Sequence, residues 1–178
     1  MTTQDGGLQW SQLIGCFFIF YCYLFAEKKP IWNVLLAHGI TGFAGCLVET
    51  LFQALRCAGN TDPNVAYLIA FNEINWIIFE ASTVLFSYIK ASTVIINERV
   101  RTAANVFMAV AFVIFAGLRI NIGRLRFAHN RLGDAEIGEA HSYAFIIWGI
   151  TDLLIFFIMM YATASQMGGK TGVSLLII

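Results

Sequence analysis

The sequence predicts an all-α protein, a polytopic bundle of transmembrane helices, on the basis of three observations. Of its 178 residues, 58% are hydrophobic and only 12% are charged, whereas soluble domains average about 25% charged residues. The mean hydropathy is +0.72. Apolar stretches recur at close to the ~20 residues that a ~30 Å hydrocarbon layer requires. We therefore expect an integral membrane protein that forms a single transmembrane domain over residues 1–178.

Five full spans are expected, at about 8–26, 31–55, 64–89, 102–120 and 142–165. The segment before the first span contains no Lys or Arg, so it does not resemble a cleaved secretory signal and the first span is read as a retained helix. Pro30 can open the second helix. Asp62 followed by Pro63 is typical of the N-cap and first position of a helix, which places the start of the third.

The fifth span ends at Gly168 and Gly169, after which an apolar run resumes from Val173 to Ile178. This run resembles the first turns of a sixth helix. It suggests that the sequence is a truncated form of a longer, seven-helix protein. The alternative is a short hydrophobic tail lying on the bundle.

The third span is two-sided. At 100° per residue, Asn72, Glu73, Trp76 and Glu80 fall on one face, and Glu98 joins them if the helix continues past the membrane. An ionised carboxylate at the centre of a bilayer costs at least ~3 kcal/mol and is usually turned toward protein or water. The sequence therefore predicts that this helix is central and that its polar face points into the bundle.

The second span carries a matching face with His38, Gly42, Gly45 and Glu49. Small residues allow close approach of helix backbones, so we expect Gly42 and Gly45 to pack against the third helix. His38 and Glu49 lie about three turns apart, so another side chain or water must connect them. In the fifth span, Asp152 is expected to join the same polar core.

The remaining segments are expected to lie outside this core. The first span, and the fourth with only Asn105 near its start, look peripheral and lipid-facing. Residues 121–141 are expected to form the one long connection. His129 and His141 lie in or beside that loop and are expected to be solvated.

The polar residues of the core are candidates for a ligand or ion path, although each can also be a structural hydrogen-bonding group. Intramembrane ionisable residues commonly mark such paths. The candidates are His38, Glu49, Asn72, Glu73, Trp76, Glu80 and Asp152.

Several function classes are disfavoured by the composition. The formal net charge is zero, and no basic cluster with interleaved aromatics indicates nucleic-acid binding. The sequence contains no CxxC or HExxH motif, so we expect no metal site and no cofactor. A nucleophile with an activating base is not recognisable at motif strength either, so we expect that the protein is not an enzyme.

The layout resembles the first five helices of a seven-helix receptor. The triplet Glu98-Arg99-Val100 resembles the acidic-Arg-aromatic triplet that closes the third helix of rhodopsin-type receptors. The third position is Val, however, the fourth span holds neither Trp nor Pro, and Cys57 has no partner Cys in 121–141. On this comparison we expect a receptor-like membrane protein, but we assign no family.

The alternative is a transporter or channel that uses intramembrane carboxylates to carry a proton or cation. The internal repeats and broken helices typical of transporters are not visible. In either case the expected partners are the lipid bilayer, a small ligand or ion in the bundle core, and an intracellular protein at Glu98 to Arg101. Loop charges weakly favour an outside amino terminus, and a plasma-membrane location is favoured.

Overall fold

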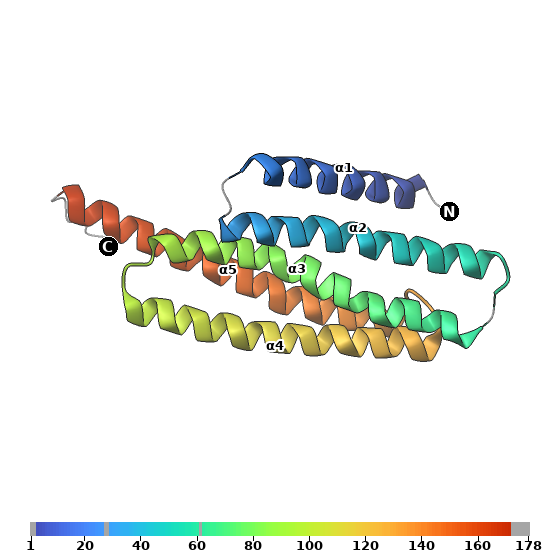
Figure 1. The fold of residues 1–178 in the computed structure, drawn as a ribbon. Helices are drawn as coiled ribbons and strands as arrows, with labels where there is room; N and C mark the ends of the chain where they lie inside the picture. Colours follow the sequence, from blue (N-terminus) through green and yellow to red (C-terminus); the bar gives the residue numbers. More distant parts are fainter. Residues whose placement is uncertain (1–2, 27–28, 61, 172–178) are drawn as a thin grey trace.

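The computed structural model describes residues 3–26, 29–60 and 62–171. Within these residues the chain forms five α-helices, and Figure 1 shows that each runs roughly antiparallel to the one before it. Their bounds are α1 Thr3–Phe25, α2 Pro30–Cys57, α3 Ala66–Val94, α4 Glu98–His129 and α5 Ala135–Thr171, with a one-turn 3₁₀ helix, η1 (Pro63–Val65), before α3.

Four of the helices are long and apolar enough to cross a membrane, namely α2, α3, α4 and the part of α5 from Ala135 to Gln166. The apolar part of α1, Leu13–Phe25, is shorter. The all-α class is therefore confirmed, and a membrane location is supported by four apolar helices, whereas a count of five full spans is not established. The predicted start of a sixth helix at 173–178 lies outside the described residues.

Helix α3 occupies the middle of the bundle because it packs against α2, α4 and α5, while α1 packs against α2. The main hydrophobic core lies between α3, α4 and α5 and includes Val84, Phe115, Ile122 and Trp148. A smaller apolar cluster of Phe52, Val65 and Ile69 closes the end where α2 turns into α3. This arrangement leaves α3 with neighbours on three sides.

The link between α3 and α4 corrects the expectation that the third helix continues past the membrane and is closed by the triplet Glu98-Arg99-Val100. Helix α3 ends at Val94, and the side chain of Asn97 accepts hydrogen bonds from the backbone N–H groups of Arg99 (2.9 Å) and Val100 (3.4 Å). Asn97 is therefore the N-cap of a new helix, since such a side chain satisfies the free donors of a first turn. The triplet Glu98-Arg99-Val100 begins α4 and does not close α3.

Helix α4 is longer than expected. It continues beyond residue 120 and ends at His129. The next residue, Asn130, is the C-cap and has a φ of 52°, the left-handed conformation common after a helix. Asp134 then accepts a hydrogen bond of 2.9 Å from the backbone N–H of Ile137 and caps α5. The predicted long loop at 121–141 is wrong, because only residues 130–134 connect the two helices.

The start of α3 differs slightly from the prediction. Asp62 accepts a hydrogen bond of 2.8 Å from the backbone N–H of Asn64. The turn that Asp62 caps is the short helix η1, and α3 itself begins at Ala66. Asp62 and Pro63 therefore start a 3₁₀ turn that leads into the helix.

Candidate functional site: a buried Glu–Arg network

Two acids on α3 face two arginines on α4. Glu73 and Glu80 are seven residues apart, and so are Arg119 and Arg126. Seven residues are close to two turns of an α-helix, so each pair lies on one face of its helix. Because α3 and α4 run antiparallel, the first acid meets the second arginine and the second acid meets the first.

The contacts form a continuous ladder. Arg119 pairs with Glu80 through two of its nitrogens, with Nε 3.0 Å from Oε2, and its Nη1 lies 3.0 Å from Oε2 of Glu73. Arg126 Nη1 lies 2.6 Å from the other oxygen of Glu73. Glu73 thus bridges both guanidinium groups. Both Glu73 and Arg119 are only 2% exposed, so these are buried ion pairs.

Helix α2 contributes a third acid. Glu49 Oε1 accepts hydrogen bonds from Trp76 Nε1 (2.9 Å) and from Arg126 Nη1 (3.1 Å). The two helices approach closely at Gly45, where an added Cβ would lie 3.4 Å from the Trp76 ring. The carbonyl of Gly45 also accepts a 3.0 Å hydrogen bond from Asn72. Gly45 therefore lies at the point where the aromatic ring of Trp76 packs on α2, at a distance that an added Cβ would turn into ordinary van der Waals contact.

Helix α5 adds His141. Its Nδ1 lies 3.4 Å from Nη1 of Arg119, and its Nε2 lies 3.2 Å from Nη2 of Arg126. A neutral imidazole has one N–H, so only one of its nitrogens can accept a hydrogen bond at a time. His141 can therefore accept from either arginine but not from both at once. The prediction that His141 is solvated is wrong, because the residue is partly buried between the two guanidinium groups.

His129 lies at the end of α4 beside the start of α5. Its Nδ1 is 2.5 Å from Asp134 and its Nε2 is 3.6 Å from Glu136, and about a third of its side chain is exposed. His129 therefore sits in a partly solvated surface cluster, separate from the contacts of the Glu–Arg network.

The network ends at an apolar boundary near the middle of α3. The Arg119 guanidinium lies 6.0 Å from the centroid of the Phe115 ring, which stacks on Trp148 at 4.5 Å. Trp148 donates a 2.8 Å hydrogen bond to the backbone carbonyl of Glu80. Beyond this point the interface of α3, α4 and α5 is filled by the main hydrophobic core.

His38 lies on a separate polar contact between α2 and α3. Its Nδ1 is 2.9 Å from both Ser82 Oγ and the Phe79 carbonyl, and its ring stacks on Phe79 at 4.1 Å. Phe79 also meets Trp76 edge-on at 5.5 Å. The aromatic rings of Phe79 and Trp76 thus lie between His38 and Glu49, where a polar connection was expected.

The structure brings some candidate residues together and leaves others apart. The network contains three of the predicted acids, Glu49, Glu73 and Glu80. Two further candidates, Asn72 and Trp76, join α3 to α2 by hydrogen bonds. The two predicted packing residues, Gly42 and Gly45, are buried on α2. Asp152 is half-buried on α5 about three turns beyond His141. Within the described part of the chain, no hydrogen bond or ion pair involves Asp152.

The fourth helix is not peripheral, which corrects the prediction from the sequence. It supplies both cations of the network: Arg119, which lies at the end of the predicted span 102–120, and Arg126, which was expected to lie in the loop 121–141. The hydropathy pattern failed to predict the full length of this helix, because each arginine lowers the mean hydropathy of its segment. It does so even when acids on a neighbouring helix neutralise the arginine. The signal that could have found them is the shared spacing of seven residues in the acids and in the arginines.

Comparisons with known proteins give no further guidance, since no protein-family model, no curated protein and no solved structure matches the chain.

Proposed function

We propose that this is a multi-pass membrane protein in which α2, α3, α4 and α5 cross the bilayer, and that the Glu–Arg network carries protons across it by coupling proton binding to a change in helix packing. One observation carries the proposal. Three carboxylates, Glu49, Glu73 and Glu80, share two guanidinium groups, those of Arg119 and Arg126. With every group ionised the network holds one excess negative charge.

An excess charge in a bundle interior is unfavourable because ions lose most of their solvation there. One added proton makes the network neutral, and its loss restores the charge. A metal ion or sodium ion suits the site less well, because each carboxylate already contacts a guanidinium that such an ion must displace. A proton adds to a single oxygen and needs no such displacement.

The network has an open end and a closed end. The side chain of Glu49 is 26% exposed, against 3% for Glu73 and 13% for Glu80. Nε of Arg126 is buried without a hydrogen-bond partner among the described residues, and a water molecule commonly fills such a position. The other end abuts the core around Phe115 and Trp148. Proton exchange therefore takes place at Glu49, and passage further requires α3, α4 and α5 to repack.

The test is proton flux in reconstituted vesicles. Purified protein is inserted into liposomes that contain a pH-sensitive dye, and a pH gradient is imposed across the membrane. We expect flux from the unaltered protein, and we expect Glu49→Gln, Glu73→Gln and Glu80→Gln each to abolish it. Glu98→Gln is the matched control, because Glu98 is an exposed acid at the start of α4, 86% exposed in its side chain, and we expect it to retain full flux.

Loss of folding is separated from loss of function by a second measurement. Each variant is checked for an unchanged helical circular dichroism spectrum and a single size-exclusion peak in detergent. Undiminished flux in folded Glu49→Gln and Glu80→Gln protein would contradict the proposal. The absence of flux in the unaltered protein would contradict it as well.

A receptor-like role is the second candidate, and it is favoured by a cavity of about 360 Å³ that lies between α3 and α4 beside Glu73. In this role a ligand rearranges the network and an intracellular partner binds at Glu98 to Arg101, with an outside amino terminus in the plasma membrane. The flux experiment separates the two roles. A receptor of this kind transports no protons, so its Gln variants and the unaltered protein behave alike in the vesicles.

A further inference from the structure

The charged residues are distributed unevenly between the two ends of the bundle. One end, which we call the α3–α4 end, holds the turn between α3 and α4, the start of α2 and the last turns of α5 (Figure 1). In the described part of the chain this end carries one acid, Glu98, and five basic residues. The basic residues are Lys29, Lys90, Arg99, Arg101 and Lys170.

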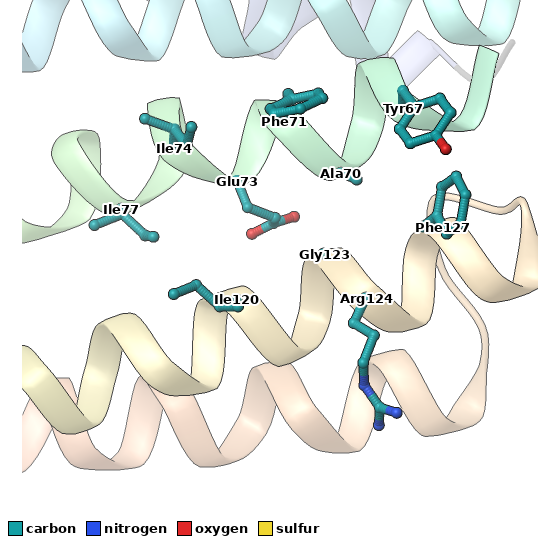
Figure 2. A pocket seen from close by; sticks show the side chains of 10 residues that line it. All are labelled: Tyr67, Ala70, Phe71, Glu73, Ile74, Ile77, Ile120, Gly123, Arg124 and Phe127. Atoms are coloured by element: carbon teal, nitrogen blue, oxygen red, sulfur yellow. The ribbon is translucent and has the colours of Figure 1, made fainter. Parts of the chain in front are cut away.

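The opposite end holds the turns between α2 and α3 and between α4 and α5, together with the start of α1. Its acids are Asp5, Asp62, Asp134, Glu136 and Glu139, and its arginines are Arg56, Arg124 and Arg131. Figure 2 shows the guanidinium of Arg124 directed away from the gap between α3 and α4, and it contacts Asn121 on its own helix. His129 also lies here, beside two of the acids. A chain of zero net charge is thus basic at one end and acidic at the other.

This asymmetry depends on where Arg119 and Arg126 lie. Counted with the opposite end, they would make the two ends equal in basic residues. Both are buried, and both bind Glu73 inside the bundle, so neither faces a membrane surface. Once they are assigned to the Glu–Arg network, the Lys and Arg residues of the α3–α4 end outnumber those of the opposite end by five to three in the described part of the chain.

The cations of the α3–α4 end lie where the helices leave the apolar layer. Lys90 is exposed near the end of α3, and its ammonium lies 4.0 Å from the ring centroid of Phe86. Arg99 and Arg101 are exposed in the first turn of α4, where Arg101 lies 3.3 Å from Glu98. Basic residues close to the ends of spans keep those ends in the cytoplasm. They are also attracted to the anionic lipids of the cytoplasmic leaflet.

We propose that the α3–α4 end binds the anionic headgroups of the cytoplasmic leaflet, so that the α2–α3 and α4–α5 turns face the opposite compartment. Glu49 lies in the half of α2 that is nearer to Cys57. The most exposed acid of the network therefore lies in the half of the bundle away from the cytoplasm. The inference rests on the bilayer crossing that the proposed function includes, but it does not depend on proton transport.

The test is the reaction of exposed cysteines with a maleimide that cannot cross membranes, in spheroplasts of a bacterial host that expresses the full chain. Cys57 is exposed at the end of α2. We expect Cys57 to react in intact spheroplasts and Cys57→Ser to abolish the reaction. The matched position is Ile96, which is 77% exposed in the turn between α3 and α4. Ile96→Cys in the Cys57→Ser background should react only after the spheroplasts are lysed.

A second set of variants tests whether the charges set this orientation. Lys90→Gln combined with Arg99→Gln and Arg101→Gln removes three cations of the α3–α4 end. We expect the fraction of Cys57 that reacts in intact spheroplasts to fall toward about one half, the value for insertion in either direction. Arg124→Gln with Arg131→Gln removes two exposed arginines of the opposite end. This control should leave the fraction unchanged.

The possible outcomes separate this inference from the proposed function. If Ile96→Cys reacts in intact spheroplasts and Cys57 reacts only after lysis, the orientation is wrong but the crossing of the bilayer stands. If both positions react from the same side, α3 does not cross the bilayer and the proposed function fails as well. An unchanged orientation in the triple Gln variant would also overturn the inference, because the basic end would then not determine it.

Discussion

Arg119 offers the strongest test of the buried network. It is 2% exposed and pairs with Glu80 and Glu73. In Arg119→Met, both carboxylates lose a cation and one arginine must balance three acids. Breaking a buried ion pair in this way typically costs about 3–5 kcal/mol, mostly because a charge is left buried and uncompensated. We therefore expect Arg119→Met to lower the free energy of unfolding by about that amount.

A double-mutant cycle isolates the pair. Glu80→Gln alone removes one partner of Arg119, whereas in the double variant neither charge is left alone. The cost of Arg119→Met with Glu80→Gln should therefore be smaller than the sum of the single costs by about 1–3 kcal/mol. The measurement is denaturant-induced unfolding in lipid–detergent micelles followed by tryptophan fluorescence, because Trp148 and Trp76 lie beside the network.

The matched control is an exposed pair on the same helix. Arg101 lies 3.3 Å from Glu98, and their side chains are 47% and 86% exposed. Exposed pairs contribute about 0–1 kcal/mol, so Arg101→Met should change stability by less than about 1 kcal/mol. If Arg119→Met costs no more than this control and shows no coupling to Glu80→Gln, the idea of a low-dielectric ion-pair network is wrong.

Three further predictions concern helix packing and helix ends. Gly123→Ala should lower the free energy of unfolding by about 1–3 kcal/mol, because the added Cβ would crowd Glu73. Gly117→Ala, whose Cβ would meet nothing within 4 Å, should raise it by up to about 1 kcal/mol. Equal effects of the two variants in thermal unfolding would refute the close approach of α3 and α4 at Gly123. Asn97→Ala should cost about 1 kcal/mol through loss of the cap of α4, and an unchanged melting temperature would contradict this. The backbone N–H of Ile137 holds the pKa of Asp134 below its usual value, so its stabilising effect is present above about pH 4 and is lost as the pH falls further. Asp134→Ala should therefore destabilise more at pH 6 than near pH 3, and an equal loss at both pH values would argue against the capping role.

The polar face of α3, with Glu73 and Glu80, is the part of the candidate site that could be predicted from the sequence. A carboxylate inside a long apolar segment must face protein or water, so Glu73 and Glu80 could be placed inside the bundle from hydropathy and helical period alone. The face of α2 with Gly45 and Glu49 followed from the same reasoning. Asp152 shares this character but makes no contact with those acids, because the part of α5 that reaches the network is three turns earlier, at His141.

Helix α4 shows where that reasoning fails. Hydropathy assigns each arginine an unfavourable free energy of transfer into lipid, and this value ignores a compensating acid on another helix. Arg119 and Arg126 therefore ended the predicted span early and created a loop at 121–141 that does not exist. The break between α3 and α4 was missed for a related reason, since a side-chain cap such as Asn97 is recognisable only when the following backbone N–H groups are known to point at it.

The sequence by itself determined the helical class, the membrane character and the inward face of α3, because these depend on composition and on the period of a single helix. The tertiary structure decided which charges meet. Two acids and two arginines with the same spacing of seven residues become a neutralising ladder only when α3 and α4 lie antiparallel and in register. That register is set by packing around Ala70, Gly123 and the Phe115–Trp148 pair, which no single helix contains.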